Sequence, residues 1–289
     1  MMKSLCSTEL SLSFFQITLM RKLTLLLVLL AGQFPSAALA QNSELGLPFI
    51  RNYSPKEYRA DIQNWAIVQD DRGVMYFGNN LGVLEYDGVA WRLLRLPNKS
   101  YVRSLAKDAD GRVYVGGVGD FGYLASDSLR GSVFVSLLAH VPEAERSFAD
   151  VWGIYATASG VYFRTASHLF RWSEDSRQIK FWKAVTSFHG SFEVNGTLYL
   201  RQWEIGLLKL EADSLVLLSG GAQFANERVY VMLPFPGDDQ KILVGTRTQG
   251  MFIFDGVSFR PFKTAADEFV KANLLYQPGA ILQNGSMVF

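Results

Sequence analysis

The sequence predicts an all-β fold, a β-propeller of four-stranded antiparallel blades, with about five complete blades and one incomplete blade. Three observations predict it: short apolar strands recur at a regular spacing, a glycine-containing turn follows the first strand of each repeat, and Asp-Gly or Asn-Gly pairs mark tight hairpins. No stretch keeps a sustained helical period, and residues 264–271 could form a short helical turn at most.

The repeat is aligned on its turn glycines, which lie 36 to 49 residues apart: Gly73, Gly111, Gly160, Gly196, Gly237 and Gly285. Propeller blades repeat about every 40 to 50 residues and hold four strands each. The last repeat stops at Phe289, one residue before the glycine that the pattern predicts. We therefore expect the chain to be the N-terminal part of a longer protein; a naturally short five-bladed ring is the alternative.

The strand after each turn is an almost unbroken apolar run, at residues 74–77, 113–115, 161–163, 198–200, 242–244 and 287–289. Strands of this kind are typical of sheets covered on both faces, as in stacked blades. Asp110-Gly111, Asn195-Gly196 and Asn284-Gly285 predict hairpins in which both central residues have positive φ. Asp87-Gly88 and Asp255-Gly256 mark a second hairpin. Residues 142–146 predict a longer connection between blades, with a functional insertion as the alternative.

The first forty residues predict export. A basic pair, Arg21-Lys22, precedes a short apolar run, and the small-residue site Ala38-Leu39-Ala40 follows it. We expect a signal peptide at 1–40, cleaved after Ala40, a lead-in segment at 41–62 and the propeller at 63–289. An uncleaved anchor and a start at Met20 are the alternatives. The mature chain would be periplasmic or extracellular, because no later segment could span a membrane.

Cleavage would also change the chemistry of the chain. It removes Cys6, the only cysteine, which excludes disulfides and thiolate metal sites in the mature protein. Three basic residues and one acidic residue leave with it, so the formal charge falls from +1 to about −1. A chain so close to neutral has no electrostatic basis for binding nucleic acid.

Candidate ligand-binding residues lie at the start of the first strand of each blade, which lines the central channel of a propeller. Eight residues before each clear turn glycine stand Trp65, Arg103, Trp152 and Phe188. Three aromatic rings and a guanidinium would suit a planar or sugar-like ligand, with Asn64, Asp150 and His189 as polar contacts. Ordinary packing between blades is the alternative. Trp203, Arg201 and Arg164 form a second candidate group on an outer strand or loop.

Other chemistries find little support. Asp108 and Asp110 match part of a calcium loop without its later acidic ligand, so turn formation explains them better. His140, His168 and His189 lack paired spacing, which predicts no metal site and no cofactor. No nucleophile or phosphate motif occurs, and we assign no catalytic residue. Only Asp150 and Glu193 could form a carboxylate pair for glycoside cleavage in the channel mouth.

The repeat resembles the two-component regulator propeller family, whose units read V-x-x-[IL]-x-x-D-x-x-G-x-[LVIM]-[WYF]-[VIF]-G-T-x-x-G-[LV]. Residues 102–116 carry the first half and residues 242–252 the second. The opening at 48–58, running into 64–67, also resembles such ectodomains, and the similarity covers 46–289. Arg164 and Arg201 stand where the family has glycine, which either disturbs the close strand approach there or places two cations on one rim.

The resemblance implies a periplasmic sensing region that precedes a linker, a membrane helix and a cytoplasmic output domain such as a histidine kinase. This chain would then be a non-catalytic sensor that binds a small molecule, such as a carbohydrate, or a periplasmic protein. Self-association and attachment to the inner membrane would come from segments beyond Phe289, and no nucleic acid partner is expected. A secreted propeller lyase or glycosidase and a rigid protein-interaction module are the alternatives.

Overall fold

Five four-stranded antiparallel sheets and one two-stranded sheet form the described part of the chain, residues 50–127, 131–276 and 278–289 of a computed structural model. The first sheet holds β1 (Asn64–Gln69), β2 (Met75–Asn79), β3 (Gly82–Tyr86) and β4 (Trp91–Leu94). The second holds β5 (Val102–Lys107), β6 (Val113–Gly117), β7 (Phe121–Asp127) and β8 (Gly131–Ser136). The third holds β9 (Gly153–Thr157), β10 (Gly160–Arg164), β11 (His168–Ser173) and β12 (Gln178–Lys183).

The fourth sheet holds β13 (Phe188–Val194), β14 (Thr197–Gln202), β15 (Gly206–Glu211) and β16 (Ser214–Leu217). The fifth holds β17 (Val229–Phe235), β18 (Asp238–Thr246), β19 (Met251–Phe254) and β20 (Phe259–Pro261), and β21 (Ala280–Ile281) pairs with β22 (Met287–Val288). The predicted signal peptide, with Cys6, lies outside the described residues.

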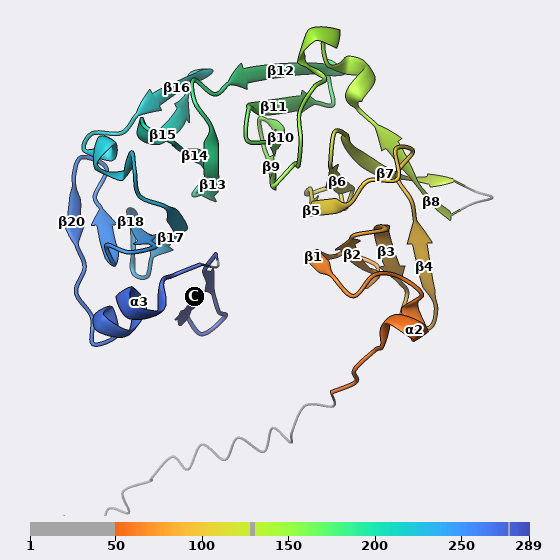
Figure 1. Cartoon of the computed structure of the whole chain (residues 1–289), viewed down its shortest axis with the longest axis horizontal. Helices are drawn as coiled ribbons and strands as arrows, with labels where there is room; N and C mark the ends of the chain where they lie inside the picture. The colour runs from red at the N-terminus through yellow and green to blue at the C-terminus, as the bar shows by residue number, and fades with distance from the viewer. Residues whose placement is uncertain (1–49, 128–130, 277) are drawn as a thin grey trace, which may run out of the picture. The chain divides into compact units, whose positions relative to one another are not determined.

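Each four-stranded sheet is a meander, because its strands pair in chain order from first to fourth. Within the compact unit Tyr53–Phe289, the sheets follow one another with their first strands inward (Figure 1). Among neighbouring first strands, β1 contacts β5, β5 contacts β9, and β13 contacts β17. The prediction of a β-propeller, with five full blades and a shorter sixth unit, is confirmed.

The hydrophobic core lies between the blades, as the unbroken apolar strands predict. Tyr76 and Val83 of the first blade pack with Val102 and Val115 of the second, and three similar clusters join the following blades in turn. Between the second and third blades, Phe121 stacks on Phe163 with ring centroids 4.4 Å apart. Each sheet thus removes its neighbour's apolar face from water, which is the main source of stability in such an array.

The turns differ in length from one blade to the next. Asn195 and Gly196 both have positive φ, 51° and 78°, and form the predicted two-residue turn between β13 and β14. The prediction of the same geometry at Asp110-Gly111 and Asn284-Gly285 is wrong, because only the glycine is left-handed there. The loop at Gly111 is longer: the Asp108 N–H bonds to the Arg112 carbonyl, and three residues lie between them.

Short helices occupy the connections. They are α2 (Pro55–Tyr58), η1 (Leu138–His140), η2 (Glu143–Glu145), η3 (Gly221–Phe224) and α3 (Asp267–Asn273). The seven residues of α3 exceed the single turn predicted, whereas η2 lies in the predicted longer connection. Tyr53 and Tyr58 of the lead-in segment pack against Trp91 of β4. Among the described residues, no helix is long and apolar enough to cross a membrane.

Candidate ligand-binding site

One residue projects from the start of each inner strand because the strand pairing skips it. The register of the first, second, fourth and fifth blades breaks around Trp65, Arg103, His189 and Tyr230. In the third blade, Trp152 occupies the matching place directly before Gly153. A bulge of this kind turns one side chain away from the sheet, so it places four side chains near the centre, and Trp152 joins them from the position before its strand.

The matching residue of the fourth blade is therefore His189, one position after the predicted Phe188. Loop length is the reason: counting back from the turn glycine assumes equal loops, yet the loop at 195–196 has two residues and the loop at 71–73 has three. Phe188 borders the pocket, but only 2% of it is exposed, since its ring packs with Tyr162 and Leu198 between blades. The same count missed Tyr230.

These side chains line a pocket of about 620 Å³ within the propeller unit. Its lining includes Trp65, Arg103, Trp152, Arg164, His189, Trp203, Tyr230 and Tyr276. Trp65 and Trp152 are 43% and 44% exposed, which is high for indole rings and does not fit simple packing between blades. Accessible aromatic faces beside a few polar groups are typical of small-molecule sites.

Arg103 organises one side of the pocket. Its guanidinium carbon lies 4.0 Å from the ring centroid of Trp65 and 5.1 Å from that of Trp152. Its Nε donates to Asp150 Oδ1 at 2.6 Å, so the carboxylate neutralises the cation and fixes its plane. Cation–π contact with both indoles holds them at 6.1 Å between centroids. Asp150 thus serves the site through Arg103.

His189 organises the other side. Its ring contacts Trp203 at 5.6 Å and Tyr230 at 5.3 Å between centroids, and Tyr230 in turn contacts Tyr276. The guanidinium of Arg201 lies 3.5 Å from the centroid of Trp203. The prediction that Trp203, Arg201 and Arg164 form a separate outer site is therefore wrong: Trp203 and Arg164 line this same pocket, and Arg201 lies against its wall.

Arg164 and Arg201 fit into their sheets because, in these two blades, the glycine stands on the paired first strand and not on the second strand. In the first, second and fifth blades the second strand has glycine at this place, paired with Ala66, Ser104 and Val231. In the third and fourth blades Arg164 pairs with Gly153, and Arg201 pairs with Gly190. Directly paired residues share a face of the sheet, so each glycine leaves room for a guanidinium. The pairing within each sheet is therefore kept, whereas β9 and β13, the first strands of the third and fourth blades, do not approach each other as closely as β1 and β5 or β5 and β9 do.

Two of the predicted polar residues take other roles. Asn64 accepts a hydrogen bond from Asn79 Nδ2 at 2.8 Å and is not among the residues lining the pocket. Glu193 accepts from the Gly196 N–H at 2.6 Å, at the hairpin end of β13, opposite to the end that carries His189. The predicted convergence of Asp150 and Glu193 on the channel mouth is therefore wrong.

The electrostatics of the pocket are unbalanced toward positive charge. Its described lining includes two arginines and no aspartate or glutamate. Arg103 Nη1, Arg201 Nη1 and His189 Nδ1 are buried and have no hydrogen-bond partner among the described residues. Burial, and then the charges of nearby arginines, lower the pKa of His189 to about 4, so this imidazole is neutral at pH 7. Burial likewise lowers the pKa of Arg201 to about 10, which leaves it charged.

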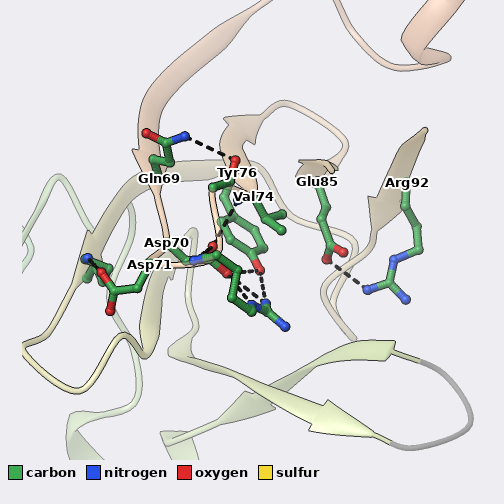
Figure 2. Close-up of polar contacts among 10 residues, drawn as sticks. Gln69, Asp70, Asp71, Val74, Tyr76, Glu85 and Arg92 are labelled. Carbon is green, nitrogen blue, oxygen red and sulfur yellow. Dashed lines mark hydrogen bonds and ion pairs between the residues drawn. The ribbon is translucent and has the colours of Figure 1, made fainter. Parts of the chain in front are cut away.

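A second pocket, of about 470 Å³, lies at the opposite ends of the first two blades, where Asp70 and Arg72 form an ion pair. Figure 2 shows the polar contacts around Asp70. Asp70 accepts hydrogen bonds from the backbone N–H groups of Arg72 and Val74 and from the Arg72 guanidinium at 2.7 Å. Burial favours a higher pKa for Asp70, but these bonds outweigh it and hold the pKa below its usual value. Glu85 and Arg92 form another pair, at 2.8 Å. This network stabilises a turn and leaves no evident demand for a ligand.

The remaining candidates are structural. Asp108 accepts from the N–H groups of Asp110 and Arg112, which confirms its interpretation as a turn residue. His168 contacts Glu145 through Nε2 and Ser167 through Nδ1, while His140 packs on Trp172. Within the described ranges, no three metal-ligating side chains come together.

Comparison with known proteins supports the fold. No protein-family model matches the chain, and no curated protein matches it. Among solved structures, it is similar to the extracellular domain of a hybrid two-component system from B. thetaiotaomicron, at 14% identity and a TM-score of 0.55. A second structure, described as a one-component system from the same organism, gives 14% and 0.54. Virginiamycin B lyase from Staphylococcus aureus gives 10% and 0.55.

The coverage of these matches differs. The chain aligns over 79% of its own length with the first sensor domain and spans 30% of the length of that domain; for the second the values are 78% and 30%. It spans 85% of the lyase with 79% of its own length. At such identities the likeness concerns architecture. It confirms, at the level of the fold, the resemblance to two-component regulator propellers.

Proposed function

We propose that this chain is the ligand-sensing propeller of an exported signalling protein and that it is not itself catalytic. The observation that carries the proposal is the pocket where inner strands of five blades bring Trp65, Arg103, Trp152, His189 and Tyr230 together. A ligand that contacts several blades at once can favour one arrangement of the blades over another. Such a change can be transmitted if the ligand binds two arrangements with different affinity.

The likeness to sensor ectodomains supports this function, while the likeness to a lyase supports the rival one. An acid–base pair in the pocket would favour the enzyme. The two carboxylates that could form it are engaged elsewhere, Asp150 by Arg103 and Glu193 by the Gly196 N–H. We therefore prefer binding without turnover.

Equilibrium binding tests the proposal directly. Mono- and disaccharides, neutral and acidic, are titrated against the purified chain while tryptophan fluorescence and thermal stability are followed. We expect saturable quenching that Trp65→Ala and Arg103→Ala abolish. Trp182→Ala is the matched control, because this indole lies on outer strand β12 and bonds to the Asp213 carbonyl. Unchanged binding in both pocket variants would refute the site, and conversion of a saccharide by the wild-type chain would support the enzyme.

Export is a separate part of the proposal. A fusion of residues 1–45 to an alkaline phosphatase that is active only outside the cytoplasm should give activity in bacterial cells. An arginine in the apolar run, Leu26→Arg, should abolish it. Activity that survives this change, or no activity in the parent fusion, would refute export through this segment.

A further inference from the structure

We infer that the pocket selects a ligand with a negatively charged group, a carboxylate, sulfate or phosphate, carried on a compact ring. This inference rests on the proposed function and names the chemistry of its ligand. Its basis is a set of buried guanidinium groups for which the described chain supplies too little negative charge.

Arg164 is the anchor of the argument. It lines the pocket, only 8% of it is exposed, and among the described residues its one side-chain hydrogen bond is from Nε to the neutral Ser191 Oγ at 3.1 Å. No ion pair with Arg164 occurs in the described ranges. A buried cation without a counter-charge is unfavourable, so an anion that enters the pocket gains from every guanidinium N–H that it accepts.

Arg201 adds a second charge on the next blade. It is fully buried and donates to the carbonyls of Phe224 and Ala225, and its Nη1 has no hydrogen-bond partner in the part of the chain that the structure describes. Two carboxylates lie near these cations. Asp150 binds Arg103, and the negative charge of Glu227 offsets part of the effect of burial on Arg201, so Arg164 is the cation that no carboxylate of the described chain pairs with.

The aromatic residues restrict what carries the charge. Trp65 and Trp152 meet edge to face at 81° between ring planes, so one indole can stack on the face of a sugar or a planar ring while the other contacts its edge. A pocket of about 620 Å³ holds a ligand of one to three rings. The pocket therefore combines aromatic surfaces at Trp65 and Trp152 with an anion-binding position at Arg164, while Arg201 lies behind Trp203 and adds positive charge from outside the lining.

Matched pairs of probes test the charge requirement: D-galacturonate against D-galactose, and 4-hydroxybenzoate against 4-hydroxybenzyl alcohol, with inorganic sulfate and phosphate alone. Calorimetric titration of the intact chain should show at least one acidic probe binding 10-fold or more tightly than its neutral partner. Arg164→Gln should weaken that probe by about 10- to 100-fold, as expected for losing a charge-assisted hydrogen bond. Arg260→Gln removes the same charge from an exposed side chain and should change nothing.

The outcomes separate the two proposals. If a neutral probe binds as tightly as its acidic partner and still needs Trp65, the sensor function stands and the inference of an anionic ligand is wrong. If acidic probes bind unchanged to Arg164→Gln and to Arg164→Lys, the anion lies elsewhere and the inference also fails. If no probe binds at 10 mM, the inference is overturned. Binding of sulfate or phosphate without any ring acid would refute the ring requirement alone.

Discussion

The substitutions Arg164→Met and Arg103→Met test whether each arginine binds a ligand or stabilises the fold. The Arg103 guanidinium is paired with Asp150 at 2.6 Å, and their side chains are 14% and 21% exposed. Arg164 has no carboxylate partner in the described chain. Methionine has a similar length and no charge, so it fills both sites with little change in volume.

The two substitutions should change the stability differently: Arg103→Met should lower it, whereas Arg164→Met should leave it nearly unchanged or raise it. Arg103→Met leaves the partly buried carboxylate of Asp150 unpaired and removes the cation–π contact with Trp65, a loss of about 2–4 kcal/mol in the free energy of unfolding. For a unit of this size the Tm should fall by about 5–12 °C. Arg164→Met loses one hydrogen bond but removes an uncompensated buried charge, so its Tm should stay within about 2 °C of the parent or rise.

Thermal unfolding followed by circular dichroism without ligand measures both changes. Adding Asp150→Asn to Arg103→Met should recover part of the loss, because the unpaired charge is then removed as well. A fall in Tm for Arg164→Met as large as that for Arg103→Met would refute the reasoning. It would mean that the fold itself compensates the Arg164 cation.

Three further predictions concern the stability of the fold. Because the pKa of His189 is about 4 in the folded chain and near 6.5 when unfolded, the unfolded chain binds the extra proton between these values. Stability should therefore fall on acidification from pH 6.5 to 4, by about 1–2 kcal/mol once solvent screening of this partly accessible ring is allowed for, and His189→Gln should flatten this slope in urea titrations at pH 7 and 4.5. A Cβ at Gly116 would lie 2.7 Å from Val151 Cγ1, so Gly116→Ala should cost about 1–3 kcal/mol in urea unfolding, and no loss would contradict the close blade approach. Phe163→Ala should cost about 3–5 kcal/mol, because its fully buried ring stacks on Phe121; a calorimetric loss below 1 kcal/mol would contradict a core shared between blades.

The fold could be predicted from the sequence because its signals are local and repeated. Each apolar strand, each turn glycine and each Asp-Gly hairpin indicates the same unit, and five units in register outweigh the irregularity of any one. Position along an inner strand was harder to predict, because it depends on loop length. Because the loop at 195–196 has only two residues, counting eight positions back from Gly196 reaches Phe188, whereas the projecting residue, His189, lies seven positions back.

A different reference point would have found the projecting residues. Each of four follows directly after a buried apolar residue that packs between blades, Val102, Val151, Phe188 or Val229. The Arg103–Asp150 pair joins residues 47 apart. No local pattern predicts such a contact, because it depends on how neighbouring blades meet.

The exchange of glycine and arginine between strands is the strongest sign that the centre of the third and fourth blades serves a ligand. Three blades show that a glycine on the second strand packs well, so stability alone does not require arginine at 164 or 201. An arginine at either position also requires a glycine at the paired position of the first strand. A Cβ at Gly153 would lie 3.1 Å from Ser191 Oγ, the atom that Arg164 contacts. Gly153→Ala should therefore displace the Arg164 side chain. It should clearly weaken the binding of an acidic probe while it lowers the Tm only slightly. An equal effect of Gly153→Ala on a neutral probe would show that the glycine serves packing alone.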